Sequence, residues 1–378
     1  MRVALVTNNY FPYKGGVARS VHMLYQTVQR QGYDARIITF PFISVADETH
    51  HIIRVYSPLR FFYKTQIGVM PFLLYRQLDA IFNQLKPHII HIHHPFLLGY
   101  AALQWGQQHN VPVVFTYHTQ YDQYLYHAPM AGSLCLYLLQ QRLATVFSAI
   151  HALIVPSQSI AQQLEPLLAL QKTSVTVIPT PVELDFFYMT RAPIVHSTLR
   201  KPLALLSVSR LVPEKNIPFL LDALCYVRDL PVTLTIAGYG FYYDYLKHYA
   251  YQQCKLNQAQ VCFVQSPSRD TVYRLYQMTD LFVFASYTET QAIVLAEALA
   301  SGVPVIAKRA PGAIDYIAHG HTGYLIDTPE QMGQQIRMLF FNRIQLQQLS
   351  TQAKQASIRL FDHSSFSRSI ISLYAGLK

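Results

Sequence analysis

Short apolar runs alternate with helix-forming stretches along this chain, and the alternation occurs in two separate blocks. The apolar runs of the first block are Arg2 to Thr7, Ala35 to Phe40, His88 to His93 and Val113 to His118, with a helix expected from about Val17 to Gln31. Those of the second block are Leu203 to Ser209, Thr233 to Gly238, Gln260 to Val264, Leu281 to Ala285 and Val303 to Ala307. Such alternation is typical of parallel sheets covered by helices, so the sequence predicts an α/β fold with two Rossmann-like domains.

The boundary between the two blocks is marked by prolines. Pro179 and Pro181 precede a weakly patterned stretch that continues to Pro202. With 378 residues the chain also exceeds one ordinary core, at about 150 residues per domain. We therefore expect an N-terminal domain over residues 1–182, a C-terminal domain over 183–357 and a cleft between them.

The glutamine-rich stretch 331–355 is predicted to be helix rather than a low-complexity tail. Its apolar residues recur at helical intervals, as Met332, Ile336 and Leu339 show. Hydrophobic residues make up 51% of the chain and charged residues 13%, which favours folded cores over disorder.

The cysteines and the apolar stretches indicate where in the cell the protein is expected. The four cysteines lack CxxC spacing, and the start of the chain turns polar at Thr7, unlike a signal peptide. The longest apolar region, Leu134 to Val155, is interrupted by Gln140, Gln141 and Arg142, which makes it a poor transmembrane span. We expect a cytoplasmic protein, either soluble or peripheral on the cytoplasmic face of a membrane.

A formal net charge of +10 favours anionic partners such as phosphates or acidic lipid surfaces. The sequence has no dense Lys/Arg stripe and no nucleic-acid-binding motif. We therefore expect no nucleic acid partner.

Two glutamates lie around a predicted helix start in the second block. Glu289 follows the apolar run Leu281 to Ala285, and Glu297 lies within the helix-forming stretch Ala292 to Ala300. A helix that begins near Thr290 or Gln291 would present backbone N–H groups of residues 290–293 to a diphosphate, while the acids accept hydrogen bonds from sugar hydroxyls. Glu289 is then expected to bind the sugar and Glu297 the ribose. The alternative is that Glu289 merely favours a helix N-terminus and that Glu297 is a solvated helical residue.

Two cations follow the first apolar run of the second block. Arg210 and Lys215 lie at the end of a predicted strand, where open α/β sheets bind ligands. We expect both to hold a diphosphate and to stabilise its charge as it departs, which would remove the need for a metal. Surface charges without a role are the alternative.

Glycines and loop residues complete the expected donor site. Gly16, in the loop after the first strand, and Gly238, after Thr233 to Ala237, permit close backbone approach. Val264 begins a segment expected to meet the base through backbone groups. A two-glycine turn alone is more often an ordinary loop, because the full dinucleotide fingerprint is absent.

His118 ends another predicted strand and is expected at the same cleft. A satisfied core histidine is the alternative. His91, His93 and His94 form a cluster, but alternation along a strand sends His91 and His93 to one face and His94 to the other. With no adjacent Cys, Asp or Glu, we expect no metal site.

Taken together, these motifs resemble a known family. The stretch from Thr288 to Ala307 resembles the signature of family-4 retaining glycosyltransferases, and so does the spacing of Arg210 from Lys215-Asn216. The resemblance covers nearly the whole chain. It implies a GT-B fold, in which segment 358–378 forms a helix that packs back on the N-terminal domain, and a nucleotide-sugar donor without a metal cofactor. Expected donor-binding residues are Gly16, Arg210, Lys215, Gly238, Val264, Glu289, Thr290, Gln291, Ala292, Ile293 and Glu297.

The stretch after Thr116 is similar to the acceptor-side motif of bacterial diacylglycerol glucosyltransferases in that family. The similarity implies acceptor-binding roles for Tyr117, His118, Thr119, Tyr121, Asp122 and Tyr124. It also implies that His118, Glu289, Arg210 and Lys215 serve the reaction, with UDP-glucose as donor and a diacylglycerol-type lipid as acceptor. Cations interleaved with aromatics between Arg60 and Arg76 fit contact with a membrane surface.

Two alternatives remain open. The chain is either a transferase that uses another UDP- or GDP-sugar on a glycan or phosphoinositol, or a membrane-associated protein that binds a nucleotide-sugar without turnover. The second alternative is supported by departures from the family pattern at Ala292, Pro181 and Gln265.

Overall fold

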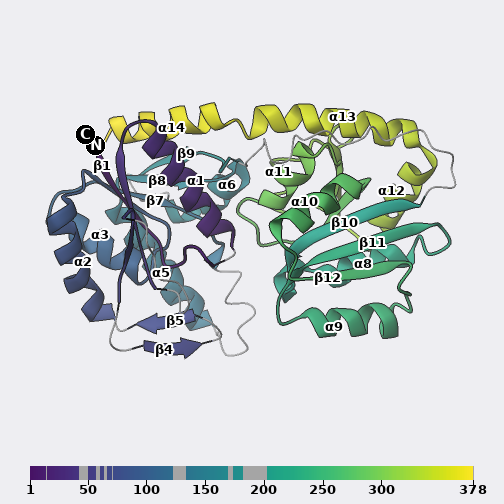
Figure 1. Ribbon diagram of the computed structural model, residues 1–378, viewed down its shortest axis with the longest axis horizontal. Helices are drawn as coiled ribbons and strands as arrows, with labels where there is room; N and C mark the ends of the chain where they lie inside the picture. The colour runs from purple at the N-terminus through teal and green to yellow at the C-terminus, as the bar shows by residue number, and fades with distance from the viewer. Residues whose placement is uncertain are drawn as a thin grey trace. The chain divides into compact units, whose positions relative to one another are not determined.

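The computed structural model describes residues 1–13, 15–41, 50–56, 60–63, 66–69, 71–121, 133–168, 173–181 and 202–377. The chain divides into two compact units (Figure 1). Unit 1 comprises Met1–Pro181 with His363–Lys378, and unit 2 comprises Val182–Asp362. The division after Pro181 lies one residue before the boundary expected from the prolines, and the chain returns to unit 1 at His363 rather than at residue 358.

Unit 1 alternates strands and helices, as the apolar pattern predicts. Its strands are β1 (Arg2–Val6), β2 (Asp34–Thr39), β3 (Ile52–Arg54), β4 (Arg60–Tyr63), β5 (Gln66–Val69), β6 (Ile89–Ile92), β7 (Val113–Thr116), β8 (Ala152–Val155) and β9 (Ser174–Val177). Its helices are α1 (Gly16–Arg30), α2 (Pro71–Leu85), α3 (Leu98–Gln108), α5 (Ser133–Ala149), α6 (Gln158–Leu168) and α14 (His363–Ala375).

The main sheet of unit 1 is parallel, in the order β3-β2-β1-β6-β7-β8-β9 among the residues described. Strand β1 lies between β2 and β6, with Val3 opposite both Ala35 and Ile89. Strand order therefore reverses at β1 and β6, which makes the loops after these two strands the expected ligand-binding edge.

Helices cover both faces of this sheet, which explains why β6, β7 and β8 are buried throughout. One core contains Leu78 of α2, Leu103 of α3 and Phe147 of α5. The other contains Val21 and Leu24 of α1.

Helix α14, the C-terminal helix, belongs to the second of these cores. Phe366, Ile370 and Tyr374 recur at helical spacing and pack with Val3 and Val21. Figure 1 shows α14 beside α1 and β1, with both chain termini close together.

Unit 2 repeats the alternation. Its strands are β10 (Leu203–Arg210), β11 (Val232–Tyr239), β12 (Val261–Gln265), β13 (Leu281–Phe284), β14 (Val305–Lys308) and β15 (Gly323–Ile326). Its helices are the 3-10 turn η1 (Pro213–Lys215), α8 (Ile217–Cys225), α9 (Tyr243–His248), the π-helical η2 (Tyr249–Gln253), α10 (Arg269–Met278), α11 (Ile293–Ala300), α12 (Pro329–Phe341) and α13 (Arg343–Leu360).

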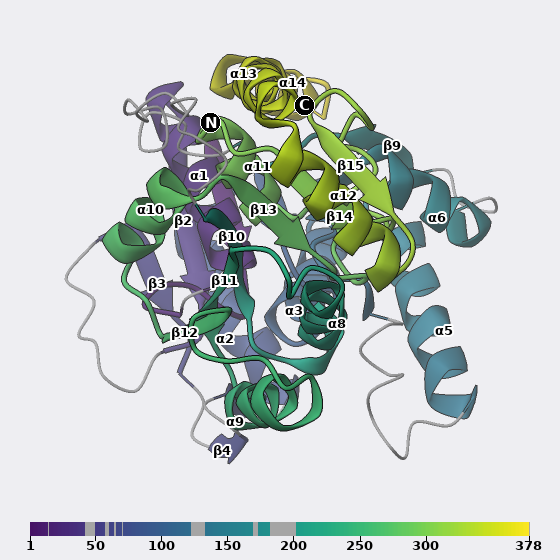
Figure 2. The same cartoon turned by 90° about the vertical axis from the view of Figure 1, so that its right-hand side faces the viewer.

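The sheet of unit 2 is also parallel, in the order β12-β11-β10-β13-β14-β15 among the residues described. Its strand order reverses at β10 and β13. Helices α8 and α12 pack on one face and α10 and α11 on the other (Figure 2). Two Rossmann-like folds in one chain confirm the predicted α/β architecture.

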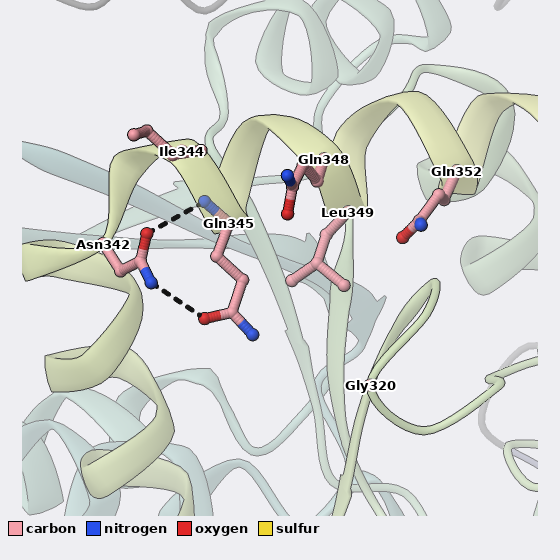
Figure 3. Close-up of a pocket in the computed structure, with 7 residues that line it drawn as sticks. All are labelled: Gly320, Asn342, Ile344, Gln345, Gln348, Leu349 and Gln352. Atoms are coloured by element: carbon pink, nitrogen blue, oxygen red, sulfur yellow. Dashed lines mark hydrogen bonds between the residues drawn. The ribbon is translucent and has the colours of Figure 1, made fainter.

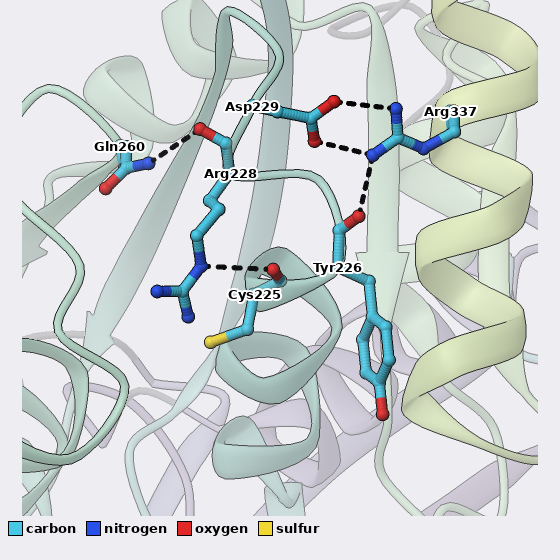
Figure 4. Close-up of polar contacts among 6 residues, drawn as sticks. All are labelled: Cys225, Tyr226, Arg228, Asp229, Gln260 and Arg337. Carbon is cyan, nitrogen blue, oxygen red and sulfur yellow. Dashed lines mark hydrogen bonds and ion pairs between the residues drawn. The ribbon is translucent and has the colours of Figure 1, made fainter.

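Helix α12 also holds the turn that leads from α8 into β11. The Arg337 guanidinium of α12 donates to both carboxylate oxygens of Asp229, at 2.8 and 2.5 Å, and to the Tyr226 carbonyl at 3.0 Å (Figure 4). A bidentate ion pair of this kind fixes orientation as well as distance.

The stretch 331–355 is helical, as predicted, but it belongs to two helices rather than to one continuous helix. Asn342 separates α12 from α13 with φ −109° and ψ 74°, outside the helical region. Its side-chain oxygen accepts a hydrogen bond from the Gln345 N–H at 3.0 Å and so caps α13. Asparagine caps helices well because its side-chain oxygen accepts a hydrogen bond from a backbone N–H of the first turn. The apolar periodicity on either side of Asn342 does not reveal such a break.

No helix among the described residues is both long enough and apolar enough to cross a membrane. The four cysteines all lie in described segments and are free thiols.

Candidate functional site

The edge of unit 2 where strand order reverses carries the predicted cations and acids. Arg210 ends β10, Lys215 ends η1, and Glu289 lies in the loop after β13. The Lys215 ammonium forms an ion pair with Glu289 across 74 residues of sequence. The Arg210 guanidinium pairs with Glu214 at 3.3 Å. Cations and acids from two neighbouring strand ends therefore meet at the position where open α/β sheets bind ligands.

The ion pair is largely withdrawn from water. Lys215 is 8% exposed, and the Glu289 side chain is about one fifth exposed. An ion pair so placed is screened less by salt than one on the surface.

Hydrogen bonds connect the two loops that carry this pair. Asn216 adopts the left-handed conformation, φ 52°, which ends η1 and begins α8. Its amide donates to the Ala285 carbonyl at 3.5 Å, and the Ser286 hydroxyl donates to the Glu214 carbonyl at 3.3 Å. The loop after β10 is thereby fixed against the loop after β13.

Gly312 packs closely against the backbone of Glu289, and the sequence did not predict this contact. Its φ of +77° suits glycine, and a Cβ there would lie 2.8 Å from the Glu289 carbonyl oxygen. The Pro311-Gly312 dipeptide was the available signal, since it marks a tight turn.

Gly238 has a packing role at the same edge. A Cβ at Gly238 would lie 1.8 Å from the carbonyl oxygen of Ser209 on the neighbouring strand β10. Val264 lies on β12 and packs against the core that contains α10 and α11. The structure thus places both residues at the carboxyl ends of adjacent strands.

The helix start expected at Thr290 or Gln291 is wrong, because α11 begins at Ile293. Thr290 and Gln291 are buried in the preceding loop, and the Ile293 N–H already donates to the Gln291 carbonyl at 3.0 Å. Ala292 precedes the helix with φ −78°. That backbone is unstrained for alanine, so the departure from glycine at this position needs no rearrangement.

Glu297 is buried, at 4% exposed, so it is not the solvated helical acid of the alternative interpretation. The hydroxyl of Tyr276, from α10, lies 3.2 Å from the Glu297 carboxylate and 3.1 Å from the Val294 carbonyl. A buried carboxylate needs such a partner, and sequence alone did not indicate which residue supplies it.

In unit 1, the loops after β1 and β6 meet where strand order reverses. The Asn8 backbone N–H donates to Nδ1 of His94 at 3.2 Å, and the Thr7 hydroxyl lies 3.4 Å from the same nitrogen. Gly16, predicted in the loop between β1 and α1, is the exposed first residue of α1.

His118 follows β7 and meets His93, which directly follows β6. Nε2 of His118 lies 2.9 Å from Nδ1 of His93. His93 in turn stacks on His91, with ring centres 4.5 Å apart. As predicted, His91 and His93 lie on the same side, although β6 itself ends at Ile92.

All of these imidazoles are neutral near pH 7. Burial lowers the pKa of His118 to about 3, with contributions from the charges that His94 and His91 would carry. Burial likewise lowers the pKa of His91 to about 3 and of His94 to about 4. The pKa of His93 is also well below its usual value, first because of burial and then because of its histidine neighbours.

The other expected acceptor-side residues lie beside His118. Tyr117 is buried, with its ring centre 5.6 Å from that of Tyr121, and Thr119 is half-buried. Asp122 and Tyr124 lie outside the described residues, as do the side chains of residues 60–73 in the proposed membrane-contact segment.

A pocket of about 220 Å³ lies elsewhere in unit 2, along α13 (Figure 3). Its lining residues are Gly320, Asn342, Ile344, Gln345, Gln348, Leu349 and Gln352. None of the predicted site residues contributes to it. Among the residues described, no cluster of His, Cys, Asp and Glu has the arrangement of a metal site.

Comparison with known proteins identifies similar sequences over both units. A profile described as Glycosyltransferase Family 4 matches residues 14–186, and one described as Glycosyl transferases group 1 matches residues 194–356. The chain is 30% identical over 353 residues to an alpha-monoglucosyldiacylglycerol synthase of Streptococcus pneumoniae, covering 86% of this chain and 78% of that protein. It is 29% identical over 350 residues to a GDP-mannose-dependent alpha-mannosyltransferase of Mycobacterium tuberculosis, covering 87% and 85%.

Among solved structures, the sucrose-phosphate synthase of Thermosynechococcus elongatus superposes with a TM-score of 0.83. The match covers 100% of this chain and 98% of that one at 19% sequence identity. At this identity the likeness supports the fold alone.

Proposed function

Because this chain belongs to glycosyltransferase family 4, we propose that it transfers glucose from UDP-glucose to a lipid of the diacylglycerol type. Donor and acceptor are taken from the name of the Streptococcus pneumoniae relative. Such an acceptor would bring the protein to the cytoplasmic surface of a membrane as a peripheral enzyme. The net charge of +10 suits both an anionic donor and an anionic membrane surface.

The observation that carries this proposal is the Lys215–Glu289 ion pair where strand order reverses in unit 2. A diphosphate needs cations, and a hexose needs groups that accept hydrogen bonds from its hydroxyls. The ion pair brings one cation and one hydrogen-bond acceptor to the same edge of the unit 2 sheet. In this proposal Lys215 binds the diphosphate and Glu289 orients the sugar.

Arg210 and Lys215 act on the leaving group. As the bond between the anomeric carbon and the phosphate oxygen breaks, negative charge accumulates on UDP, and both cations stabilise it. Lys215 has three N–H donors and Arg210 five, so each can contact phosphate while keeping its glutamate partner. Glu297, held by Tyr276, binds the ribose hydroxyls.

The acceptor hydroxyl forms the new bond to the anomeric carbon and gives its proton to the departing phosphate. Family resemblance implies attack from the same face, so that the anomeric configuration is retained. The resemblance to the family implies that His118 also serves the reaction.

We further propose that turnover needs no metal, since Arg210 and Lys215 supply the positive charge that a metal would otherwise supply. Turnover should then be unchanged, within about twofold, when EDTA replaces added Mg²⁺ or Mn²⁺. A metal-dependent rate, restored by adding back the ion, would contradict this point.

A mannosyl donor is the second candidate. It is favoured by the 29% identity to a GDP-mannose-dependent enzyme. The donor-site residues would serve a GDP-sugar equally well, because the diphosphate is common to both donors.

Release of UDP or GDP from a panel of sugar donors tests these alternatives. Each donor is supplied with and without vesicles that contain diacylglycerol, and Glu289→Ala serves as the blank. UDP release from UDP-glucose that vesicles stimulate supports the proposal. GDP release from GDP-mannose supports the second candidate, and no release from any donor contradicts both.

A further inference from the structure

His91 and His93, next to His118, stack on each other and each form hydrogen bonds that the proposed reaction does not use directly. His91 is fully buried, and both of its ring nitrogens have partners. Nδ1 lies 2.6 Å from the Tyr374 hydroxyl of α14, and Nε2 lies 2.7 Å from the Thr116 hydroxyl of β7. His91 is therefore held in one orientation from both sides of its ring.

His93 stacks on this fixed ring at an interplanar angle of 17° and is 1% exposed. Its Nδ1 shares a hydrogen bond with Nε2 of His118. Its Nε2 is buried and meets no hydrogen-bond partner in the part of the chain that the structure describes. His93 therefore has one satisfied nitrogen and one unsatisfied nitrogen.

This asymmetry decides which ring carries the shared hydrogen. A neutral imidazole has one N–H and one lone pair. If His118 donated, the hydrogen of His93 would lie on Nε2, as a buried N–H without a partner. Orphaned buried N–H groups are rare in native structures because their desolvation is not compensated. If His93 donates from Nδ1, only a lone pair remains unmatched at Nε2.

We infer that His93 is a positioning residue that donates from Nδ1 to Nε2 of His118 and so fixes His118 as its Nδ1–H tautomer. Within the proposed function, on which this role rests, His118 then presents a hydrogen-bond donor to an oxygen of the substrates. Nδ1 of His118 cannot take the proton of the hydroxyl that attacks the sugar, since that nitrogen already carries hydrogen. Proton removal is thereby left to the departing phosphate.

The tautomer can be read without any substrate. The protein is labelled with ¹⁵N-histidine, and two-bond ¹H–¹⁵N correlation spectra at pH 7.5 distinguish protonated from unprotonated ring nitrogens. His118→Gln identifies the His118 signals by their loss. We expect protonated Nδ1 and unprotonated Nε2 on His118. The opposite pattern would overturn the inference, whichever sugar is the donor.

Two substitutions separate positioning from packing. His93→Asn keeps an N–H donor near the position of Nδ1, whereas His93→Leu keeps bulk without a donor. We expect His93→Asn to preserve the His118 tautomer and most of the kcat/KM for donor turnover. His93→Leu should give mixed tautomers and lower kcat/KM by roughly 10- to 100-fold.

Equal losses in the two variants, with the His118 tautomer intact in both, would show that His93 only fills space and would overturn the role. If His93→Leu fails to fold, the wild-type spectrum and His93→Asn still decide. Failure of the nucleotide-release panel leaves the spectrum unaffected, so the two failures are distinguishable.

Discussion

Lys215 is the residue whose loss should harm turnover most cleanly. Lys215→Met keeps the aliphatic stem but removes the charge that faces the departing diphosphate, and we expect kcat to fall by roughly 100- to 1000-fold. Steady-state UDP release measures the effect. Lys247→Met, on α9 where the ammonium lies 5.6 Å from the Tyr243 ring centre, is the matched control and should stay near wild type. Equal kcat values in the two variants would show that Lys215 does not bind the diphosphate.

Gly312 offers a second test at the scale of single residues. Alanine at φ +77° costs about 1–2 kcal/mol of stability, and its Cβ would also press on the Glu289 carbonyl. Gly320 has the same strain, φ +78°, but a Cβ there would meet nothing within 4 Å. We expect both variants to lose stability in urea unfolding, Gly312→Ala more because of this additional clash, while only Gly312→Ala lowers kcat for UDP release. Matched kcat values would mean that Gly312 does not position Glu289.

At the scale of helices and strands, apolar spacing predicted the two parallel sheets but not where some helices begin and end. Asn342 splits one periodic stretch into α12 and α13, and α11 starts at Ile293 after a buried loop. The cap at Asn342 is a local hydrogen bond that apolar spacing does not report, whereas the buried loop before α11 depends on tertiary contacts, which overrule local propensity. Sequence placed Glu289 and Lys215 at strand ends, yet their pairing depends on strand order, and the supports from Gly312 and Tyr276 come from distant segments.

Among the described residues, a buried hydrogen bond between the Tyr374 hydroxyl and Nδ1 of His91 links helix α14 to the sheet. Tyr374→Phe keeps the ring but leaves Nδ1 of His91 without its partner, so we expect a loss of about 1–3 kcal/mol in the free energy of unfolding. Trp105 fluorescence in urea reports on unit 1, because this is the chain's one tryptophan and is buried there. Ser372→Ala, at an exposed position of the same helix, should change little. A Tyr374→Phe variant as stable as Ser372→Ala would show that α14 is held by packing alone.

For the molecule as a whole, the buried histidines predict that the two units respond differently to acid. His91, His93, His94 and His118 all lie in unit 1, and burial lowers the pKa of each below its usual 6.5. Above pH 6.5 neither the folded nor the unfolded chain protonates them, so they do not affect stability there. As pH falls below 6.5, the unfolded chain takes up protons that the folded chain excludes, until pH nears about 4 for His94 and about 3 for His91 and His118. Each histidine then lowers the free energy of unfolding by about 1.4 kcal/mol per pH unit.

The urea midpoint of Trp105 fluorescence should therefore fall steeply between pH 6.5 and 4.5. Circular dichroism follows the backbone of both units, and part of its signal should persist after the Trp105 transition at pH 5. At pH 7.5 the two transitions should lie closer together, because the histidine contribution is absent. A Trp105 midpoint that is the same at pH 7.5 and pH 5 would mean that these histidines take up protons in the folded state. In that case His118 could not be a neutral hydrogen-bond donor at the reaction centre under mildly acidic conditions.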